Sequence, residues 1–463
     1  MKNKNKTFSI GSVVLINKVD DELNYFDNLF KGIKGKAKTI TNTAKLLVYN
    51  RLGKCVSVNR FQDFYPEELY SKLRFKNIPS ERTIYRDLSR IGKNHQFILG
   101  NHQKIILNEK LNCDTNFIDF SSTYFEGRGS ELGKLGYSRD NQPGKKQITF
   151  GISTGINEIP TALTIQEGNV QDKKHFKIML KTASAVLPEN SLLIFDCGAN
   201  TRENKKDVLV RGFNYLTLKP KKKEHYKERI NLFNTSEQIL FTINEVNYKC
   251  VKQKSKNEFE YIFFSEELME NQLKLKERKF ERTLKKNNPI LNKTKKGKII
   301  TKYICEEGEI TTKGTLQKCL DQIPNPYITG LEGYFILESS VDVEPLRILA
   351  LYKDKDKAEK LIRNMKEGTE LRPVRHWSKF AIIGYLLVIF LANFLINLTL
   401  LRSSSKVINL KLLKKYLNNL TLTIVYPENR FKFQIISNIS PEIQNILGDF
   451  IDKYQDKNLN LRF

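Results

Sequence analysis

The stretch NFIDFSSTYFEG, residues 116–127, constrains the fold more than any other part of the sequence. It places the carboxylate of Asp119 inside an apolar run of strand-forming residues, between Ile118 and Phe120. Burying an unpaired charge is so costly that an aspartate in such a run is usually paired with a cation or holds a metal ion. Asp119 is therefore the first candidate functional residue.

The patterns that follow alternate between strands and helices. Three strand-like runs come first, at 116–127, 145–154 and 160–169. A helix at 173–187 leads to an apolar strand at 191–199, which carries Asp196. A short helix at 201–212 and a last strand at 213–219 follow. This order is typical of the ribonuclease H-like α/β fold, in which helices flank a mixed sheet. We expect the first and fourth strands to be neighbours at the centre of that sheet, so that Asp119 and Asp196 lie close enough to share a metal ion.

A third carboxylate, Glu359, lies in LYKDKDKAEKLIRNMK, residues 351–366, which has helical spacing. At about 100° per residue, five of its side chains fall within about 80° of one another. They are Tyr352, Lys355, Glu359, Arg363 and Lys366. A solvated surface helix has the same pattern, but here the segment ELRPVRHW and a long apolar run follow directly. We therefore expect one helix that presents an acid and several cations beside a core.

Asp119, Asp196 and Glu359 would together supply the oxygen ligands that Mg²⁺ prefers in proteins. Two such ions, roughly 3.5–4 Å apart, stabilise both the attacking and the leaving oxygen of an in-line displacement at phosphorus. We expect two Mg²⁺ ions, with Mn²⁺ as a substitute, at these three catalytic residues. Cations suit backbone phosphates and a tyrosine suits a displaced nucleotide. The predicted DNA-binding residues of this segment are Tyr352, Lys355, Arg363 and Lys366.

The formal net charge of +27 favours a polyanionic partner, with nucleic acid first and an anionic membrane second. A generally basic proteome is the alternative explanation. Residues 67–73 and 77–92 are typical of a helix-turn-helix, in which Ser80 caps the second helix and Arg86 and Arg90 lie on it. We expect these arginines to contact double-stranded DNA, although ordinary pairs of short helices have the same pattern.

Residues 380–400, FAIIGYLLVIFLANFLINLTL, are long and apolar enough for a membrane-spanning helix. Asn393 and Asn397 lie inside this segment, and the sequence has no second segment of the kind. A helix that is buried on all sides in a large core has the same composition. We expect this core helix and no membrane association.

Changes in pattern divide the chain into five predicted regions. The first is a mostly helical DNA-binding region, and the third is a β-rich insertion with a basic face. The second and fourth form the catalytic core, and the fifth is a C-terminal region. They span 1–110, 111–220, 221–345, 346–405 and 406–463.

Together these residues resemble the DDE transposases of prokaryotic insertion sequences, in the branch with a β-rich insertion before the final glutamate. The similarity rests on IDFSSTYFEG, GYSRDNQP, EGNVQD, FDCGAN and LYKDKDKAEKLIRNMK followed by ELRPVRHW, in that order. The signature of the family on its last helix is Tyr, two residues, Arg, three residues, Glu, six residues, Lys. It matches Tyr352, Lys355, Glu359 and Lys366, with lysine in place of arginine. Lysine keeps the charge but not the bidentate grip on phosphate.

The resemblance implies a cytoplasmic, nucleoid-associated prokaryotic enzyme that binds terminal inverted repeats and target DNA as a homodimer. Strand cleavage would free a 3′-OH, which then attacks the other strand or the target in cut-and-paste transposition. A metal nuclease with the same triad but without strand transfer is an alternative. So is a DNA-binding regulator or inactive transposase derivative without catalysis. A membrane-anchored protein is a further alternative, which rests on residues 380–400 alone.

Overall fold

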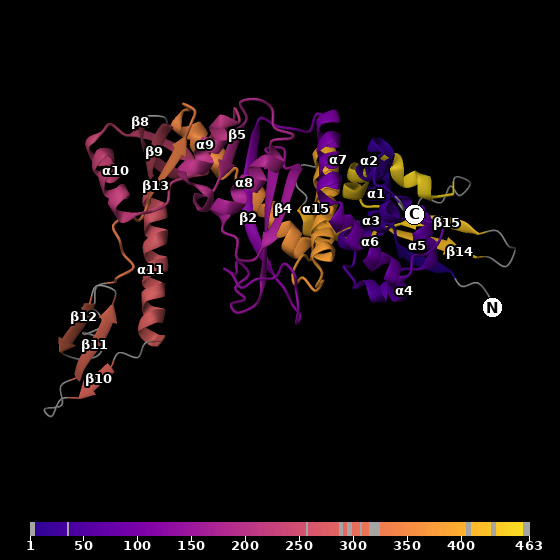
Figure 1. Cartoon of the computed structure of the whole chain (residues 1–463), viewed down its shortest axis with the longest axis horizontal. Helices are drawn as coiled ribbons and strands as arrows, with labels where there is room; N and C mark the ends of the chain where they lie inside the picture. The colour runs from indigo at the N-terminus through magenta and orange to yellow at the C-terminus, as the bar shows by residue number, and fades with distance from the viewer. Residues whose placement is uncertain are drawn as a thin grey trace. The chain divides into compact units, whose positions relative to one another are not determined.

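The computed structural model describes residues 5–34, 37–255, 258–286, 290–293, 299–305, 308–313, 325–403, 409–426 and 432–456 (Figure 1). The chain forms two units. Unit 1 comprises Met1–Asn214 and Asp354–Phe463, and unit 2 comprises Tyr215–Lys353. Unit 1 combines many helices with a mixed sheet, so the predicted α/β class is confirmed.

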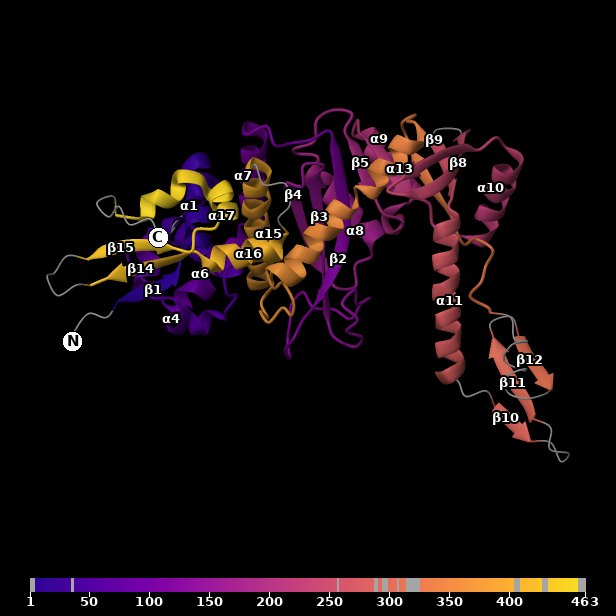
Figure 2. The same ribbon diagram turned by 180° about the vertical axis from the view of Figure 1, so that it is seen from behind.

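The sheet of unit 1 contains β2 (Thr115–Tyr124), β3 (Gln147–Gly155), β4 (Pro160–Glu167) and β5 (Leu192–Phe195). Their spatial order is β4-β3-β2-β5 (Figure 2). β2 pairs antiparallel with β3, β3 pairs antiparallel with β4, and β2 pairs parallel with β5. The prediction that the first and fourth strands are neighbours is therefore confirmed.

Helices make up most of the rest of unit 1. Those before the sheet are α1 (Gly11–Leu23), α2 (Tyr25–Phe30), α3 (Ala37–Leu52), the 3₁₀ turn Val58–Arg60, α4 (Phe61–Phe64), α5 (Glu67–Lys72), α6 (Glu81–Lys93) and α7 (His95–Asn108). Those after β4 are α8 (Asp172–Ala183), the 3₁₀ turn Cys197–Ala199, α9 (Arg202–Val210), α14 (Asp356–Arg363), the π-helical turn Asn364–Gly368, α15 (Lys379–Arg402), α16 (Leu410–Asn419), α17 (Pro441–Leu447) and the 3₁₀ helix Gly448–Tyr454. A small antiparallel sheet joins β1 (Lys6–Ser9), β14 (Thr421–Val425) and β15 (Phe433–Ser437).

Helix α15 forms the core of unit 1. Among the described residues it is the one helix long and apolar enough to cross a membrane, and 89% of its most apolar window is buried inside the protein. The side-chain nitrogen of the buried Asn393 donates to Thr369 Oγ1 (3.1 Å) and to Ile389 O (2.8 Å). The interpretation of residues 380–400 as a buried core helix is therefore supported.

Two glycines let α6 and α15 approach until their backbones touch. A Cβ atom on Gly92 would lie 1.8 Å from the carbonyl oxygen of Phe380, and one on Gly384 would lie 2.2 Å from that of Leu88. No side chain fits at either distance. The predicted N-cap of α6 is confirmed, because Ser80 Oγ accepts from Thr83 N (3.3 Å).

This contact predicts opposite effects for two glycine-to-alanine substitutions. Gly92→Ala should lower the free energy of unfolding by about 1–3 kcal/mol or more, since the helices must separate to admit the methyl group. Gly100→Ala, on α7, meets nothing within 4 Å. It should raise the free energy of unfolding by about 0.5–1 kcal/mol, because alanine is the better helix former. Denaturant unfolding of both variants measures the difference; equal effects would rule out the close contact.

Unit 2 is built around an antiparallel sheet. Its strands are β6 (Asn214–Leu218), β7 (Ile239–Ile243), β8 (Val246–Ser255), β9 (Glu258–Phe264) and β13 (Tyr334–Ser339), in the spatial order β6-β13-β9-β8-β7. A second sheet has the order β10 (Ile290–Lys293), β11 (Ile299–Cys305) and β12 (Gly308–Lys313). The helices are α10 (Lys223–Thr235), α11 (Glu266–Lys286) and α13 (Pro345–Lys353).

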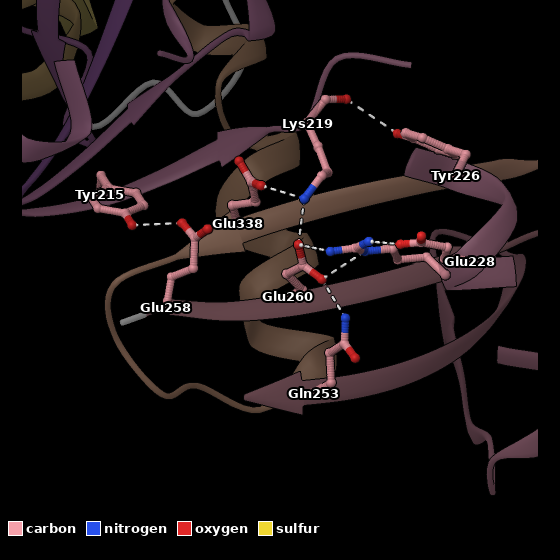
Figure 3. Close-up of polar contacts among 9 residues, drawn as sticks. Tyr215, Lys219, Tyr226, Glu228, Gln253, Glu258, Glu260 and Glu338 are labelled. Atoms are coloured by element: carbon pink, nitrogen blue, oxygen red, sulfur yellow. Dashed lines mark hydrogen bonds and ion pairs between the residues drawn. The ribbon is translucent and has the colours of Figure 1, made fainter. Parts of the chain in front are cut away.

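A buried ion network ties the first of these sheets together (Figure 3). Lys219, which follows β6, binds Glu260 on β9 and Glu338 on β13, the latter at 2.8 Å. Arg229 Nε from α10 lies 3.2 Å from Glu260 Oε2. Burial favours the neutral form of Glu260, but the two cations outweigh it and lower the pKa of this carboxyl. Glu260 is 2% exposed and Glu338 is 5% exposed, so the two cations supply the hydrogen bonds and the countercharge that water gives to an exposed carboxylate.

The same network explains a cluster of acids that resembles a metal site. Oxygens of Glu258, Glu260 and Glu338 lie within 4.8 Å of one another. Tyr215 donates its hydroxyl to Glu258 (2.8 Å), and Lys219 joins the other two carboxylates (Figure 3). Because each acid already has a donor, the cluster is interpreted as structural.

Removal of the shared cation should therefore be costly. Lys219→Met is expected to lower the free energy of unfolding by about 3–5 kcal/mol, since it leaves buried carboxylates without their counter-ion. Lys252→Met is the comparison, because Lys252 pairs with Asp342, whose side chain is 57% exposed. Loss of this exposed ion pair should lower the free energy of unfolding by less than about 1 kcal/mol. Calorimetry of the two variants makes the comparison, and similar losses would contradict the proposed role of Lys219.

Candidate active site

The pairing of β2 with β5 sets two carboxylates side by side. The parallel register places Ile118 opposite Phe195. Asp119 and Asp196 are the next residues on their chains, and adjacent strands lie about 4.8 Å apart. The two aspartates therefore follow matching positions at the carboxyl end of β5, as the sequence predicted.

Both aspartates are fixed by backbone amides. Asp119 Oδ1 accepts from Phe120 N at 2.9 Å, and its side chain is 17% exposed. Asp196 is the N-cap of the 3₁₀ turn Cys197–Ala199, where its Oδ1 accepts from Cys197 N at 2.8 Å, and it is exposed. One carboxylate is thus largely buried and its neighbour faces solvent.

Glu359 reaches the same place from α14, which packs against β2 and β3. The ammonium of Lys355 connects it to the aspartates, because Lys355 Nζ lies 2.7 Å from Glu359 Oε1 and 3.9 Å from Asp119 Oδ1. Lys355 is 7% exposed and Glu359 is 52% exposed. All four side chains line one cleft of about 300 Å³, together with Phe120, Ser121, Arg139, Asp172, Ala199 and Ile362.

Burial and charge act against each other in this cleft. Burial raises the pKa of Asp119 to about 6; the Lys355 cation opposes the shift, and the negative charges of Glu359 and Asp196 add to it. For Lys355, burial favours the neutral amine, but Asp119, Glu359 and Asp196 outweigh it and raise the pKa of the ammonium. A single cation therefore balances three carboxylates, which leaves the site with an excess of negative charge.

The expected single helix over residues 351–366 is wrong. Helix α13 ends at Lys353, α14 begins at Asp356, and a π-helical turn follows from Asn364. The turn at Asp354 and Lys355 lets the lysine point into the carboxylates, and the wider π turn buries residues that an ideal helix would expose. Tyr352 lies on α13 of unit 2, where it is half-buried.

Lys366 is not part of an exposed cationic stripe. Its Nζ lies 2.8 Å from Asp140 Oδ1, which also accepts from Arg372 Nη1 (2.9 Å). The Asp140 side chain is 1% exposed and that of Lys366 is 9% exposed. Burial lowers the pKa of Lys366, and Asp140 only partly restores it. The lysine is therefore a structural partner of a buried acid.

Two residues of the cleft were not assigned a role from the sequence. Arg139 and Asp172 form an ion pair of 2.5 Å, and both line the cleft of Asp119. Ser122 on β2 fixes this loop, since its Oγ accepts from Arg139 N at 3.1 Å. The motifs GYSRDNQP and EGNVQD held the available signal, because each carries a charged residue beside a strand.

The remaining predicted DNA-binding residues lie elsewhere on unit 1. Arg363 is exposed and lines a separate cleft of about 770 Å³ with Lys360. Arg86 is exposed on α6. Arg90 lies 3.0 Å from the buried carboxylate of Asp87 and is 36% exposed. The structure therefore brings the three acids and Lys355 together, but not the other cations.

The donor set suits a hard divalent cation, because three carboxylates converge on a small cleft with an excess of negative charge. Among the residues that the structure describes, the oxygens of Asp119, Asp196 and Glu359 do not all lie within 4.8 Å of one another. The ammonium of Lys355 stands between two of them.

No protein-family model matches the sequence, and no curated protein is similar to it. Among solved structures, the chain is similar to one described as a cryo-EM structure of a piggyBac transposase synaptic complex with hairpin DNA. The match covers 90% of this chain and 82% of that one, with 10% sequence identity and a TM-score of 0.39.

The raised pKa of Asp119 predicts how stability depends on pH when divalent cations are chelated. Its pKa in the folded protein, about 6, exceeds the ordinary value of an aspartate, so the wild type gains stability as the pH falls from above 6 towards about 4. Asp119→Asn carries no such charge. Above pH 6 the variant should be the more stable protein, by at most about 3 kcal/mol at about 1.4 kcal/mol for each pKa unit, and the difference should vanish near pH 4.

Thermal unfolding across this pH range tests the prediction. Asp356→Asn is the matched control, because Asp356 is an exposed aspartate on the neighbouring helix α14 and does not line the cleft. Its effect should stay within about 0.5 kcal/mol at every pH. A pH-independent effect of Asp119→Asn would mean that this carboxyl is not the perturbed group.

Proposed function

We propose that the protein is a DNA transposase that cleaves and joins DNA strands with the help of bound metal ions. The observation that supports this most is the β2–β5 register, which aligns Asp119 with Asp196 while α14 brings Glu359 to the same cleft. The strand order β4-β3-β2-β5, with its one parallel pair, supports a ribonuclease H-like core.

In this proposal Asp119, Asp196 and Glu359 hold two Mg²⁺ ions, or Mn²⁺ in their place. The ions, when bound, activate water and stabilise the charge that develops on the phosphate. The chain holds the carboxylates in place through the amides of Phe120 and Cys197, so that little reorganisation is needed at the moment of reaction.

Lys355 has two functions in the proposed enzyme. Without metal it neutralises part of the charge of Asp119 and Glu359, at 3.9 and 2.7 Å. With metal bound, the ions would neutralise the carboxylates in place of Lys355. Its ammonium would then be available to bind a phosphate oxygen of the DNA. Arg139 lines the same cleft and is a second candidate for contact with phosphate.

Double-stranded DNA is the proposed substrate, in the form of terminal inverted repeats and target DNA. The net charge of +27 supports it, because a surface this basic attracts and retains polyanions. A homodimer is proposed for the DNA complex, since two element ends must be joined. Such an enzyme works in the prokaryotic cytoplasm, associated with the nucleoid.

A DNA-binding regulator without catalysis is the second candidate. One observation favours it: Lys355 forms its ion pair inside the cleft, where it competes with any metal ion. A lysine that stayed there would leave the protein able to bind DNA but unable to cleave it.

Cleavage of DNA taken from the two flanks of the gene separates these candidates. With Mg²⁺ or Mn²⁺, the wild type should cut at the boundary of a terminal repeat. Asp119→Ala, Asp196→Ala and Glu359→Ala should each lose about 10²–10³-fold or more in rate, as when a group that stabilises transition-state charge is removed. DNA binding measured in chelator should persist in all three.

Asp356→Ala, on the same helix as Glu359 but outside the cleft, should cleave like the wild type. Binding without cleavage by the wild type would favour the regulator. Near-normal cleavage by Glu359→Ala alone would show that the third carboxylate is wrongly assigned.

A further inference from the structure

Another cleft of unit 1, about 660 Å³ in volume, is lined by residues that the catalytic proposal does not use. It lies among α3, α6, the start of α15 and the residues just before α15. Four arginines line it, namely Arg51, Arg86, Arg372 and Arg375, against one carboxylate, Glu370. Its volume is within the range of about 300–1,000 Å³ that is usual for ligand-binding pockets.

The positive charge available to a ligand comes from Arg51 and Arg86. The other two arginines are paired with acids: Arg372 with Asp140, and Arg375 with Glu126 at 3.2 Å. Among the described residues, Arg51 and Arg86 form no salt bridge. The guanidinium of Arg51 lies over a tyrosine ring, and Arg86 is exposed. The cleft therefore has a positive charge that its own carboxylates do not cancel.

Aromatic side chains form the floor of the cleft. The ring of His376 lies between those of Tyr385 (5.0 Å) and Tyr85 (6.1 Å). Burial lowers the pKa of His376 to about 4, so the ring is neutral at physiological pH. Arg51 lies 4.8 Å from the centre of the Tyr385 ring. A neutral aromatic surface under arginines is suited to a flat, anionic ligand.

Trp377 lines the same cleft, and its side chain is exposed to solvent. It is 68% exposed and is the one tryptophan of the chain. Its backbone is held in place, because Trp377 O accepts from Glu131 N (3.1 Å) and Lys379 N donates to Glu131 Oε2 (2.8 Å). A large apolar ring on an anchored backbone, beside uncancelled positive charge, is typical of a platform on which bases stack.

We propose that this cleft binds unpaired nucleotides of a DNA strand, with a base stacked on Trp377 and the neighbouring phosphates at Arg51 and Arg86. The inference rests on the proposed function, which makes DNA the substrate, and adds a preference for single-stranded segments. An intact duplex keeps its bases stacked inside the helix, so it meets the arginines through its phosphates alone. Only an unpaired base reaches the aromatic ring.

The single tryptophan is its own reporter. Tryptophan fluorescence of the full chain carrying Asp119→Ala, in chelator, is followed during titration with a single-stranded oligonucleotide. The same titration is made with a blunt duplex of that sequence, with inorganic polyphosphate and with a nucleoside monophosphate. We expect strong quenching by the single strand and little by the duplex or the polyphosphate, which carries phosphates without bases.

Variants assign the effect to the residues. Measured by the fluorescence anisotropy of a dye-labelled oligonucleotide, since these variants lack the tryptophan, Trp377→Ala should weaken binding of the single strand about 5- to 150-fold, the range for loss of one stacked base. Trp377→Phe should retain most of the affinity. Arg86→Gln should reduce the slope of log affinity against log salt by about 0.7. Phe97→Ala removes another exposed aromatic residue, which is 46% exposed and outside the cleft, and should change nothing.

Equal quenching by duplex or polyphosphate would overturn the proposal, as would unchanged affinity in Trp377→Ala. Tight binding of the mononucleotide would identify a pocket for free nucleotides instead of a strand. Because this assay needs neither metal nor cleavage, a protein that fails the cleavage test but passes this one would disprove the catalytic proposal and leave the single-strand site intact.

Discussion

The parallel pairing of β2 with β5 is the interaction on which the candidate active site depends. Side chains alternate between the two faces of a strand, so a slip of one residue would turn Asp119 away from Asp196. The nine paired residues between β2 and β3 hold β2 in register on its other side. The alignment of Asp119 with Asp196 is thus a consequence of sheet register, which the surrounding apolar residues enforce through their burial.

Two clusters of charged residues differ in the balance between their cations and their carboxylates. In unit 2, Lys219 and Arg229 match Glu260 and Glu338, and the acids are buried and their positions fixed. In the cleft of Asp119, Lys355 alone opposes three acids, two of which are exposed. A balanced network stabilises a fold, whereas an unbalanced one retains affinity for further cations.

The residues between the π-helical turn and α15 connect the cleft of Asp119 with the arginine-rich cleft. Asp140 pairs with Lys366 and Arg372, while its neighbour Arg139 lines the cleft of Asp119. Arg372 also lines the arginine-rich cleft. Since Asp140 is buried and paired on both sides, any displacement of this segment would disturb both places. Proper placement of α15 through the glycine contact with α6 keeps the segment anchored.

The sequence by itself determined the strand order, the buried core helix and the meeting of Asp119 with Asp196. The helix and the strands follow from apolar periodicity, and the order of the elements along the chain predicts which strands pair. It also indicated Glu359, through a charged pattern beside a core. Only the tertiary structure decided the break before α14, the turn of Lys355 into the carboxylates and the burial of Lys366 against Asp140. Lys366 meets Asp140 at a distance of 226 positions along the chain, and Lys355 meets Asp119 across a similar separation, which no local pattern encodes.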